Sequence, residues 1–522
     1  MGLLGPDEPR YAWIARAMAE TGDWVTPRLY GQPWFEKPVL YYWAAALGFR
    51  LNMPAELAAR LPSAIAALAI ALTISWLGWK HYGAEESFRK SPAFLAPLIF
   101  STSVAAIGFS RAATPDMLFS ASIALAMALA ASVLWGRGAL RATSDAVPTV
   151  VRHEKLALAS FGVFLGLAVL AKGPAAAILA GGAIGLWAIA TSQWRSAFQL
   201  FHPVAIGSFC LVALPWYILC AARNSDFIHV FVFQHNFERY LTPVFQHRQP
   251  FWFFAWITLL AMLPWTVLLI SAGQEGLRLW RERSWADSPG FFYACWAIFP
   301  IIFFSLSQSK LPGYILPAVP PLALLCAVSA PRAFQKSRSG AILIGLGFSL
   351  VWIVLAISAF FMARRFPLAG TGRIAPPAIA GFAITIGVLI VLAVLFAGIR
   401  QNLLGVADSC SLAVAAAVAF AGLVILPAMD PYLSARSDAA FLRGDRRPDR
   451  IFTYHLNRSW NYGLAFYLRR ELPEWSLQEP DAALVLTNHP GLDEIVKAGR
   501  FQGELNDTQQ GILYVPISPI PR

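Results

Sequence analysis

The sequence predicts a polytopic α-helical membrane protein with a small α/β domain at its C-terminus. Hydrophobic residues make up 57% of the 522 residues and charged residues only 13%, a composition well outside that of soluble domains. Apolar runs long enough to cross a hydrocarbon core of about 30 Å recur from residue 61 onward. Near residue 429 these runs end and a polar segment begins. These three observations define the fold class.

About twelve apolar runs are predicted to span the membrane. They lie near residues 61–80, 92–110, 114–135, 156–171, 174–191, 203–221, 252–272, 289–307, 314–330, 340–363, 376–398 and 408–428. With residue 1 placed outside, the inside loops hold fifteen lysines and arginines and the outside loops between spans hold nine. This excess follows the positive-inside rule. The net charge of +12 therefore reports topology and does not indicate a nucleic-acid partner.

The chain divides into three predicted parts. Residues 1–60 form a charged, amphipathic lead, residues 61–428 form the helical membrane body, and residues 429–522 form the α/β domain. In that domain "RIFTYHL", "AALVLT" and "GILYVPI" have the pattern of short strands, and "WNYGLAFYLRREL" and "LDEIVKAG" have helical spacing. All five cysteines fall inside predicted spans without metal-ligand spacing, which is typical of apolar core residues.

The ionisable side chains outside the spans gather in loops on one side of the membrane. The lead carries "PDEPRY" and "FEKP", and later outward loops carry "SRAATPDM", "LAKGP", "QHRQPFW" and "SQSKLPGYILP". The predicted helix interiors carry almost no ionisable group. Transporters and channels usually need such groups near the middle of the membrane. The pattern therefore favours a catalytic site at the extracytoplasmic surface over a translocation path.

The residue types in these loops suggest transfer of a group from a lipid phosphate. Carboxylates suit a general base or the oxygen ligands of a divalent cation, and the candidates are Asp7, Glu8, Glu36 and Asp116. Basic side chains and a phenol suit a phosphate-bearing leaving group, and the candidates are Lys37, Arg248, Lys310 and Tyr314. Each cluster alone also fits a structural reading, such as a helix-terminal carboxylate, a surface ion pair or an interfacial anchor.

The lead contains "DEPRYAWIARAMAETGDWVTPRLYGQPWFEKPVLYYW", followed in order by "SRAATPDMLF", "LAKGP", "HRQPFWFF" and "SKLPGYILPAVPPLALL". These segments resemble the lipid A aminoarabinose transferases and the related bacterial protein-mannosyltransferase-like enzymes. The resemblance implies a GT-C glycosyltransferase fold in the bacterial inner membrane. It also implies a polyprenyl-phosphate sugar donor, with undecaprenyl phosphate as the carrier, and an active site and C-terminal domain that face the periplasm.

The resemblance also bears on the charged start of the chain. In that family a transmembrane helix precedes the Asp-Glu motif, so the family pattern leads us to expect an additional first span before Asp7. With that span the protein would have thirteen spans. Its absence from this sequence would reflect a start codon assigned too late or a shortened chain. An upstream reading frame without an apolar run of about twenty residues would contradict this expectation.

Roles for individual residues follow from the same resemblance. Three carboxylates would be catalytic, with Glu8 as a neighbour that tunes charge: Asp7, Asp116 and Glu8. Four side chains would contact the donor phosphate: Lys37, Arg248, Tyr314 and Lys310. Two would be ligands of a divalent cation: Glu36 and His247. Lys172 is left open between a phosphate contact and a structural charge at a helix end.

The expected reaction is a single inverting displacement, in which an acceptor hydroxyl or phosphate attacks the anomeric carbon and polyprenyl phosphate leaves. The acceptor stays open between lipid A, another envelope glycan and a secreted protein, and in the last case the chain would be a protein O-mannosyltransferase. A transporter or flippase of a lipid-linked substrate is the alternative from another class. Expected partners are the donor, the acceptor and membrane lipid, without nucleic acid.

Overall fold

The computed structural model describes the chain except residues 84–86, 137–151, 239–248, 337–340, 343–344, 355–356, 358–375, 445–449, 480–482, 502–505, 508–512 and 518–522. Two compact units are present. The terminal unit comprises Met1–Trp34, Tyr42–Leu61 and Ala419–Arg522, and the helical unit comprises Phe35–Tyr41 and Pro62–Val418.

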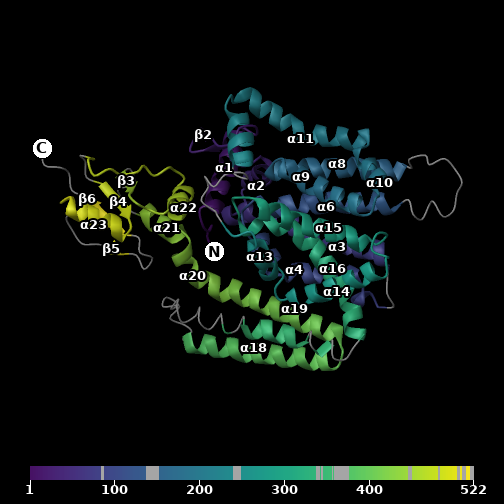
Figure 1. Ribbon diagram of the computed structural model, residues 1–522. Coiled ribbons are helices and arrows are strands. Elements are labelled where there is room, and N and C mark those ends of the chain that lie inside the picture. The colour runs from purple at the N-terminus through teal and green to yellow at the C-terminus, as the bar shows by residue number, and fades with distance from the viewer. Residues whose placement is uncertain are drawn as a thin grey trace. The chain divides into compact units, whose positions relative to one another are not determined.

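Apolar helices build the helical unit, and α6, α8, α9 and α11 run side by side within it (Figure 1). The α-helices are α3 (Ala55–Tyr82), α4 (Pro92–Ser101), α5 (Val104–Ser110), α6 (Asp116–Gly136), α8 (Arg152–Lys172), α9 (Ala175–Ala190), α10 (Trp194–Phe198), α11 (Pro203–Arg223), α13 (Phe253–Ala261), α14 (Thr266–Arg281), α15 (Pro289–Leu306), α16 (Val319–Lys336), α18 (Pro376–Ile399) and α19 (Leu403–Phe420). The 3-10 helices are η1 (Phe88–Lys90), η2 (Gln199–Phe201) and η4 (Pro312–Ala318), and η3 (His229–Glu238) is a π-helix. A second π-helix, η5 (Ala421–Ile425), belongs to the terminal unit.

The helices confirm the prediction of a polytopic membrane protein. Within the described residues, seven helices are long and apolar enough to cross a membrane, and nine if two bent pairs each count as one span. Three further predicted runs, 174–191, 340–363 and 376–398, appear as the shorter apolar helices Ala175–Ala190, Gly345–Val354 and Gly387–Ile399. Part of the run 340–363 lies outside the described residues.

Two predicted spans are broken where the sequence pattern gave one straight run. The run 252–272 forms α13 and α14, which are bent by 111°, and Pro264 lies at the break. Proline removes a backbone donor and disfavours helical geometry in the residue before it, so the helix ends there. The run 92–110 bends by 62° between α4 and α5. The Ser103 side chain caps the start of α5 by accepting from the Ala106 backbone N–H.

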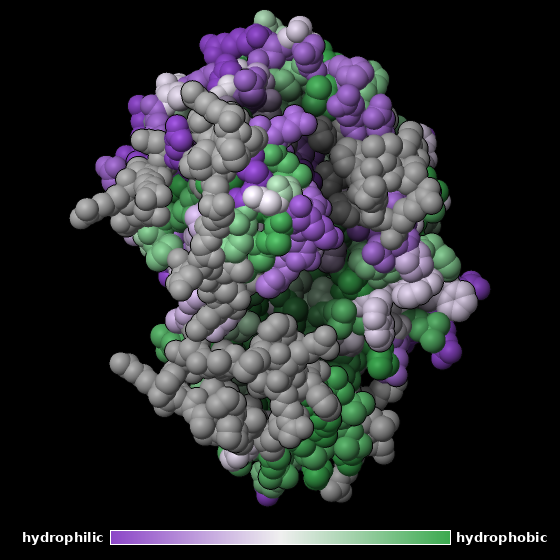
Figure 2. All heavy atoms as spheres, turned by 90° about the vertical axis from the view of Figure 1, so that its left-hand side faces the viewer, coloured by the Kyte–Doolittle hydropathy of each residue, from purple (hydrophilic) through white to green (hydrophobic). Residues whose placement is uncertain are grey.

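The helical unit buries its bulky side chains and exposes others on its outer faces. Trp187, Trp265 and Trp296 are among the largest fully buried side chains, and they belong to one continuous core cluster. Leucines remain exposed on the outer faces of this unit, as in Leu211 of α11, which is 76% exposed. Hydrophobic side chains form large exposed areas, shown green in Figure 2. Such faces are expected where lipid rather than water surrounds a helix.

The terminal unit contains a small sheet and helices from both ends of the chain. The helices are α1 (Asp7–Thr21), α2 (Leu40–Arg50), α20 (Leu426–Leu433), α21 (Arg436–Gly444), α22 (Arg458–Leu468) and α23 (His489–Lys497). A hairpin joins β1 (Arg28–Leu29) to β2 (Gln32–Pro33). The sheet has the order β3-β4-β6-β5, with strands β3 (Ile451–Thr453), β4 (Ala483–Thr487), β5 (Asn506–Asp507) and β6 (Leu513–Ile517).

The structure confirms the three strands and the two helices that the sequence predicts within residues 429–522, as β3, β4, β6, α22 and α23. Strands β3 and β4 are parallel, while β6 is antiparallel to both β4 and β5. Trp475, Val485 and Val515 lie in the core of this sheet. Short apolar segments bounded by polar residues are typical of buried strands, which is why these segments could be recognised.

The charged lead packs mainly with the C-terminal domain. Helix α1 contacts α22, where the Arg16 guanidinium donates a hydrogen bond of 2.8 Å to the Phe466 carbonyl oxygen. The guanidinium also lies 3.7 Å from the centroid of the Phe466 ring, a favourable cation–π contact. Only Phe35–Tyr41 of the first 41 residues belongs to the helical unit. The Glu36–Lys37 motif is therefore held by different elements from the Asp7–Glu8 motif.

Candidate functional site

The candidate site in the helical unit centres on an ion pair between Asp116 and Lys172. Asp116 is the first residue of α6 and Lys172 the last residue of α8, and these two helices pack against each other. The Lys172 ammonium donates a hydrogen bond to Asp116 Oδ1. The Asp116 side chain is only 18% exposed and the Lys172 side chain only 13%. Helix dipoles favour an anion at the start of one helix and a cation at the end of the other.

Tyr314 brings a phenol to the same pair. The Lys172 ammonium nitrogen lies 4.9 Å from the centroid of the Tyr314 ring. The turn η4, which carries Tyr314, is joined to α6 because the Ser120 hydroxyl donates a 3.2 Å hydrogen bond to the Leu316 carbonyl oxygen. The structure therefore brings together two predicted site residues, Asp116 and Tyr314, through Lys172.

Gly313 allows η4 to approach Asp116 closely. A Cβ atom at Gly313 would lie 3.2 Å from Asp116 Oδ1 and 2.8 Å from Phe109 Cζ. The second distance is shorter than a normal carbon–carbon contact, so any side chain at this position would push η4 or Phe109 away. Gly313 thus sets the distance between the phenol-bearing turn and the ion pair.

Replacing Gly313 with alanine is expected to lower the free energy of unfolding by about 1–3 kcal/mol, the usual range for overpacking a tight site. Gly207 offers a matched control, because a Cβ atom there would meet no atom within 4 Å. Thermal unfolding of both variants in detergent checks the expectation. Equal melting temperatures for Gly313→Ala and Gly207→Ala would show that η4 is not tightly packed on α6.

Glu36 and Lys37 add a second ion pair to the helical unit. Lys37 Nζ lies 3.5 Å from Glu36 Oε1, and the side chains are 15% and 12% exposed. The neighbouring Phe35 anchors the motif, since its ring packs edge-on to Phe227 with centroids 5.1 Å apart.

A series of aromatic contacts links Phe35 to α8. The Phe227 ring packs against Trp216 and Tyr217 at the end of α11, with centroids 5.4 Å and 6.1 Å away. The Tyr217 hydroxyl donates a 3.0 Å hydrogen bond to the Val169 carbonyl oxygen, one helical turn before Lys172. Packed aromatic side chains have few conformations, so this chain of contacts fixes Lys37 relative to Lys172.

Lys310 binds the backbone at the end of α15, and its contact with the donor phosphate stays a prediction. Its side chain is buried, and the ammonium donates a 2.5 Å hydrogen bond to the Ser307 carbonyl oxygen. Burial lowers the pKa of Lys310 because a charged amine loses hydration there. Among the described residues no contact joins Lys310 to Asp116, and the contact that is described closes the C-terminal end of α15. The predicted phosphate contact Arg248 and the predicted metal ligand His247 lie outside the described residues.

The two neighbouring carboxylates of the lead have different surroundings within the terminal unit. Asp7 is 54% exposed and pairs with Arg10 at 2.6 Å. Glu8 is only 10% exposed and pairs with Arg60 at 2.6 Å. Arg60 also donates hydrogen bonds to the carbonyl oxygens of Met1 and Gly2. Glu8 and Arg60 therefore hold the start of the chain in place, while Asp7 is accessible to a substrate.

Two residues that take part in these ion pairs, Lys172 and Arg60, were not assigned a role from the sequence. Lys172 was left open, although its place at the end of an apolar run, directly before Gly173, is typical of a charge positioned at a membrane face. Arg60 was not singled out, although it is the last residue of the predicted lead and directly precedes a long apolar run. An ionisable residue at the end of such a run is a signal that could have found both.

The predicted divalent cation has few candidate ligands among the described residues. Within the described part of the chain, no group of three or more histidine, cysteine, aspartate or glutamate side chains lies close enough to hold a metal ion. Glu36 and Asp116 each have an ammonium partner already, in Lys37 and Lys172. A cation placed beside either carboxylate would face that like charge. His247, the other predicted ligand, lies outside the described residues, so the divalent cation stays a prediction.

Comparison with known proteins identifies sequence relatives. Residues 3–231 match the family model of the dolichyl-phosphate-mannose-protein mannosyltransferases. The undecaprenyl phosphate-alpha-4-amino-4-deoxy-L-arabinose arabinosyl transferase of Edwardsiella ictaluri is 33% identical over 362 residues, which are 68% of this chain and 62% of that protein. The protein of the same name from Yersinia enterocolitica is 32% identical over 365 residues, 68% of this chain and 61% of that protein. The chain thus matches about three-fifths of the length of these relatives.

Solved structures share the fold. The crystal structure of ArnT from Cupriavidus metallidurans bound to undecaprenyl phosphate superposes with a TM-score of 0.74 at 21% identity, covering 99% of this chain and 94% of that one. The apo structure of the same protein gives a TM-score of 0.72 at 20% identity, with the same coverage. The chain therefore has the ArnT fold, as the sequence predicted.

Proposed function

Because this chain is a GT-C-fold relative of the undecaprenyl phosphate-aminoarabinose transferases and carries the mannosyltransferase domain, we propose that it is an integral-membrane glycosyltransferase. It would move a sugar from a polyprenyl phosphate, with undecaprenyl phosphate as the carrier, to an envelope acceptor such as lipid A or another glycan. The observation that carries the proposal is the polar cluster of the helical unit, in which Lys172 pairs with Asp116 beside Tyr314. The same unit holds the Glu36–Lys37 pair.

The cluster suits the leaving group of such a reaction. When the bond between the anomeric carbon and the donor phosphate breaks, its electron pair stays on the phosphate oxygen, which gains negative charge. Two ammonium groups and a phenol, from Lys37, Lys172 and Tyr314, are donors for that charge, and they are fixed before the reaction starts. Asp116 would hold Lys172 in position, because the two side chains are hydrogen-bonded.

The acceptor oxygen forms the new bond to the anomeric carbon in the same step and gives up its proton when it is a hydroxyl. A carboxylate is the natural base for that proton, and Asp7 stays the sequence-based choice. It is the more exposed of the two lead carboxylates, at 54% against 10% for Glu8. No covalent intermediate with the chain is needed, and the configuration at the anomeric carbon inverts.

The site would face the periplasm from the bacterial inner membrane. The excess of lysine and arginine in alternate loops supports this orientation, because such loops stay in the cytoplasm. Asp116 and Lys172 lie at the helix ends that adjoin loops of the opposite set. A second candidate function, protein O-mannosyl transfer, is favoured by the family model that matches residues 3–231.

A transfer assay with the purified chain tests the proposal. Radiolabelled undecaprenyl-phosphate aminoarabinose and undecaprenyl-phosphate mannose would be offered with lipid A or a serine-rich peptide. We expect transfer from a polyprenyl-phosphate sugar to lipid A, and transfer of mannose to the peptide would favour the second candidate. A chain that transfers neither sugar but moves the labelled donor across a vesicle membrane would be a flippase.

Replacing Lys37 with alanine is expected to lower the transfer rate about 10²-fold, because one donor to the leaving phosphate is lost. Lys37→Arg keeps a positive charge and should recover part of that loss. Lys497→Ala, which removes an exposed lysine of α23, is the matched control and should behave like the wild type. An undiminished rate for Lys37→Ala would remove this residue from the site.

Removal of metal ions with EDTA tests whether the transfer reaction requires the predicted divalent cation. Because lysine already pairs with the carboxylates Glu36 and Asp116, we expect EDTA to leave the transfer rate within about twofold of its untreated value. The measurement compares the rate in EDTA with the rate after addition of magnesium, manganese, calcium or zinc. A loss in EDTA that one of these ions restores would contradict the expectation and would reinstate Glu36 as a metal ligand.

A further inference from the structure

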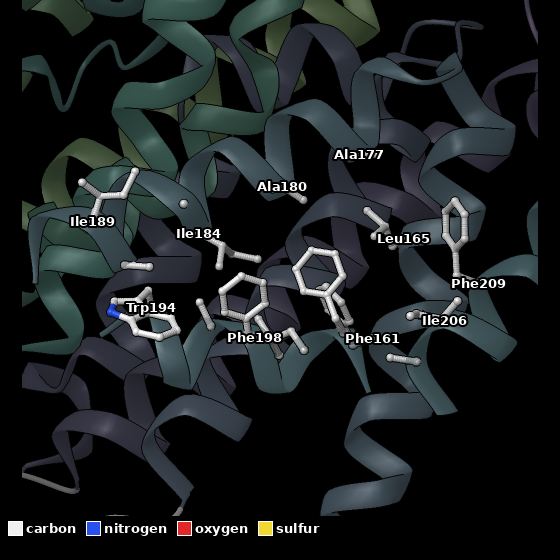
Figure 3. Close-up of a pocket in the computed structure, with 18 residues that line it drawn as sticks. Phe161, Leu165, Ala177, Ala180, Ile184, Ile189, Trp194, Phe198, Ile206 and Phe209 are labelled. Carbon is white, nitrogen blue, oxygen red and sulfur yellow. The ribbon is translucent and has the colours of Figure 1, made fainter. Parts of the chain in front are cut away.

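A second feature of the helical unit is an apolar cavity of about 650 Å³ between α8, α9, α11 and the α10–η2 segment. Its lining consists of glycine, alanine, leucine, isoleucine, phenylalanine and tryptophan side chains. Figure 3 shows the rings of Phe161, Phe198 and Trp194 along one side, with Ala180 and Ile184 of α9 opposite them. The volume lies within the range of about 300–1,000 Å³ that is typical of ligand-sized cavities.

Water is a poor occupant of this cavity. The volume corresponds to roughly twenty water molecules at about 30 Å³ each, and a buried water needs two to four polar partners. The lining offers the indole nitrogen of Trp194 beside hydrocarbon and aromatic groups. In a bilayer, a cavity of this composition is filled more favourably by a hydrocarbon chain.

Two glycines on α9 keep the cavity open. A Cβ atom at Gly181 or Gly185 would meet no protein atom within 4 Å. Glycine inside a helix is less stable than alanine, and the protein's own packing does not call for it at these two positions. The neighbouring Gly182 differs, because its Cβ would lie 1.9 Å from Phe299 Cζ. Gly181 and Gly185 therefore leave space for something other than protein.

Cationic side chains lie at one end of the same helices. Gly162 of α8 faces Ala205 of α11, and Val169 of α8 faces Tyr217 of α11, so these two helices run parallel. The start of α8, with exposed Lys155, therefore lies at the same end as the start of α11 and the α10 segment, with exposed Arg195.

The Arg195 guanidinium lies 5.3 Å from the Trp194 ring centroid. Lysine and arginine beside an interfacial tryptophan attract anionic lipid headgroups.

We propose that this cavity binds one acyl chain of an anionic phospholipid, whose headgroup lies near Arg195 and Lys155. Lys172 is the last residue of α8, at the end opposite to Lys155. The lipid headgroup would therefore lie at the other membrane face from the Asp116–Lys172 pair, so this lipid is distinct from the sugar donor. The proposal does not depend on the transferase reaction.

Two measurements on the full chain, purified in a mild detergent, test the proposal. Native mass spectrometry shows whether a lipid is retained, and analysis of the extracted lipid identifies it. The wild type is expected to keep a phospholipid enriched in phosphatidylglycerol or cardiolipin relative to the membrane extract. The double variant Gly181→Leu/Gly185→Leu fills the open space and should retain at least about tenfold less lipid. Arg195→Gln should keep a phospholipid but lose the preference for anionic headgroups.

Gly207→Leu is the matched control, because Gly207 also lies within a membrane helix with no atom within 4 Å of its Cβ, and it does not line the cavity. It should retain lipid like the wild type. The single variant Gly185→Leu replaces the double variant if that variant does not fold. Equal lipid retention by the wild type and the leucine variants at Gly181 and Gly185 would overturn the proposal. A wild type that retains a polyprenyl phosphate, or no lipid at all, would also overturn it.

Discussion

Replacing Lys172 with alanine is expected to lower the transfer rate about 10²–10³-fold and the free energy of unfolding by about 2–3 kcal/mol. The rate falls because an ammonium that would stabilise the leaving phosphate is lost. Stability falls because Asp116, which is 18% exposed, keeps a negative charge without its hydrogen-bonded partner. Steady-state transfer and thermal unfolding in detergent measure the two effects on the same preparation.

The two effects of Lys172→Ala can be separated with a second variant. Lys172→Met combined with Asp116→Asn removes both charges, so no unpaired carboxylate remains near the membrane. Stability should then return to within about 1 kcal/mol of the wild type, since replacing both partners of a buried pair is often nearly neutral. The transfer rate should stay low. A double variant with wild-type rate would show that Lys172 acts only on stability.

Asp7→Asn is expected to lower the transfer rate about 10²–10⁴-fold, the usual effect of removing a general base. The free energy of unfolding should change by less than about 1 kcal/mol, because Asp7 is 54% exposed and an asparagine amide oxygen can still accept a hydrogen bond from Arg10, which is itself only 8% exposed. The transfer assay and thermal unfolding again give both values. A stable Asp7→Asn variant with full activity would remove Asp7 from the mechanism.

Glu8→Gln provides the contrasting result. Its carboxylate is 10% exposed and binds Arg60, which also holds the carbonyl oxygens of Met1 and Gly2. Neutralising Glu8 leaves the Arg60 charge with fewer partners, so the free energy of unfolding should fall by about 2–3 kcal/mol. The rate per folded molecule should change much less than in Asp7→Asn. The reverse pattern would exchange the roles of the two neighbours.

The sequence predicted the helices and strands well, because their signals are local. Long apolar runs predict spans wherever they occur, and the strands β3, β4 and β6 follow from short apolar segments bounded by polar residues. The 111° bend between α13 and α14 was not predicted, because the run 252–272 is apolar throughout. Pro264 was visible in that run, but many membrane helices accommodate a proline.

The pairings within the site could not be predicted from local signals. Asp116 and Lys172 are 56 residues apart, and their meeting depends on how α6 and α8 pack and rotate. Asp7 and Glu8 are adjacent in sequence, yet neighbouring helical residues point about 100° apart because a turn takes 3.6 residues. Their exposed fractions of 54% and 10% follow from that rotation. Lys310 looked similar to Lys37 in the sequence, but its hydrogen bond to Ser307 depends on the end of α15.

We expect the chain to transfer a sugar to an envelope acceptor through the Asp116–Lys172 cluster. Mass spectrometry of lipid A measures this transfer in cells that lack the gene and carry the wild type, Lys172→Met or the control Lys497→Ala. We predict that a sugar-sized mass disappears in the deletion, returns with the wild type and Lys497→Ala, and stays absent with Lys172→Met. Lipid A that is unchanged by the deletion, or fully modified by Lys172→Met, would contradict it.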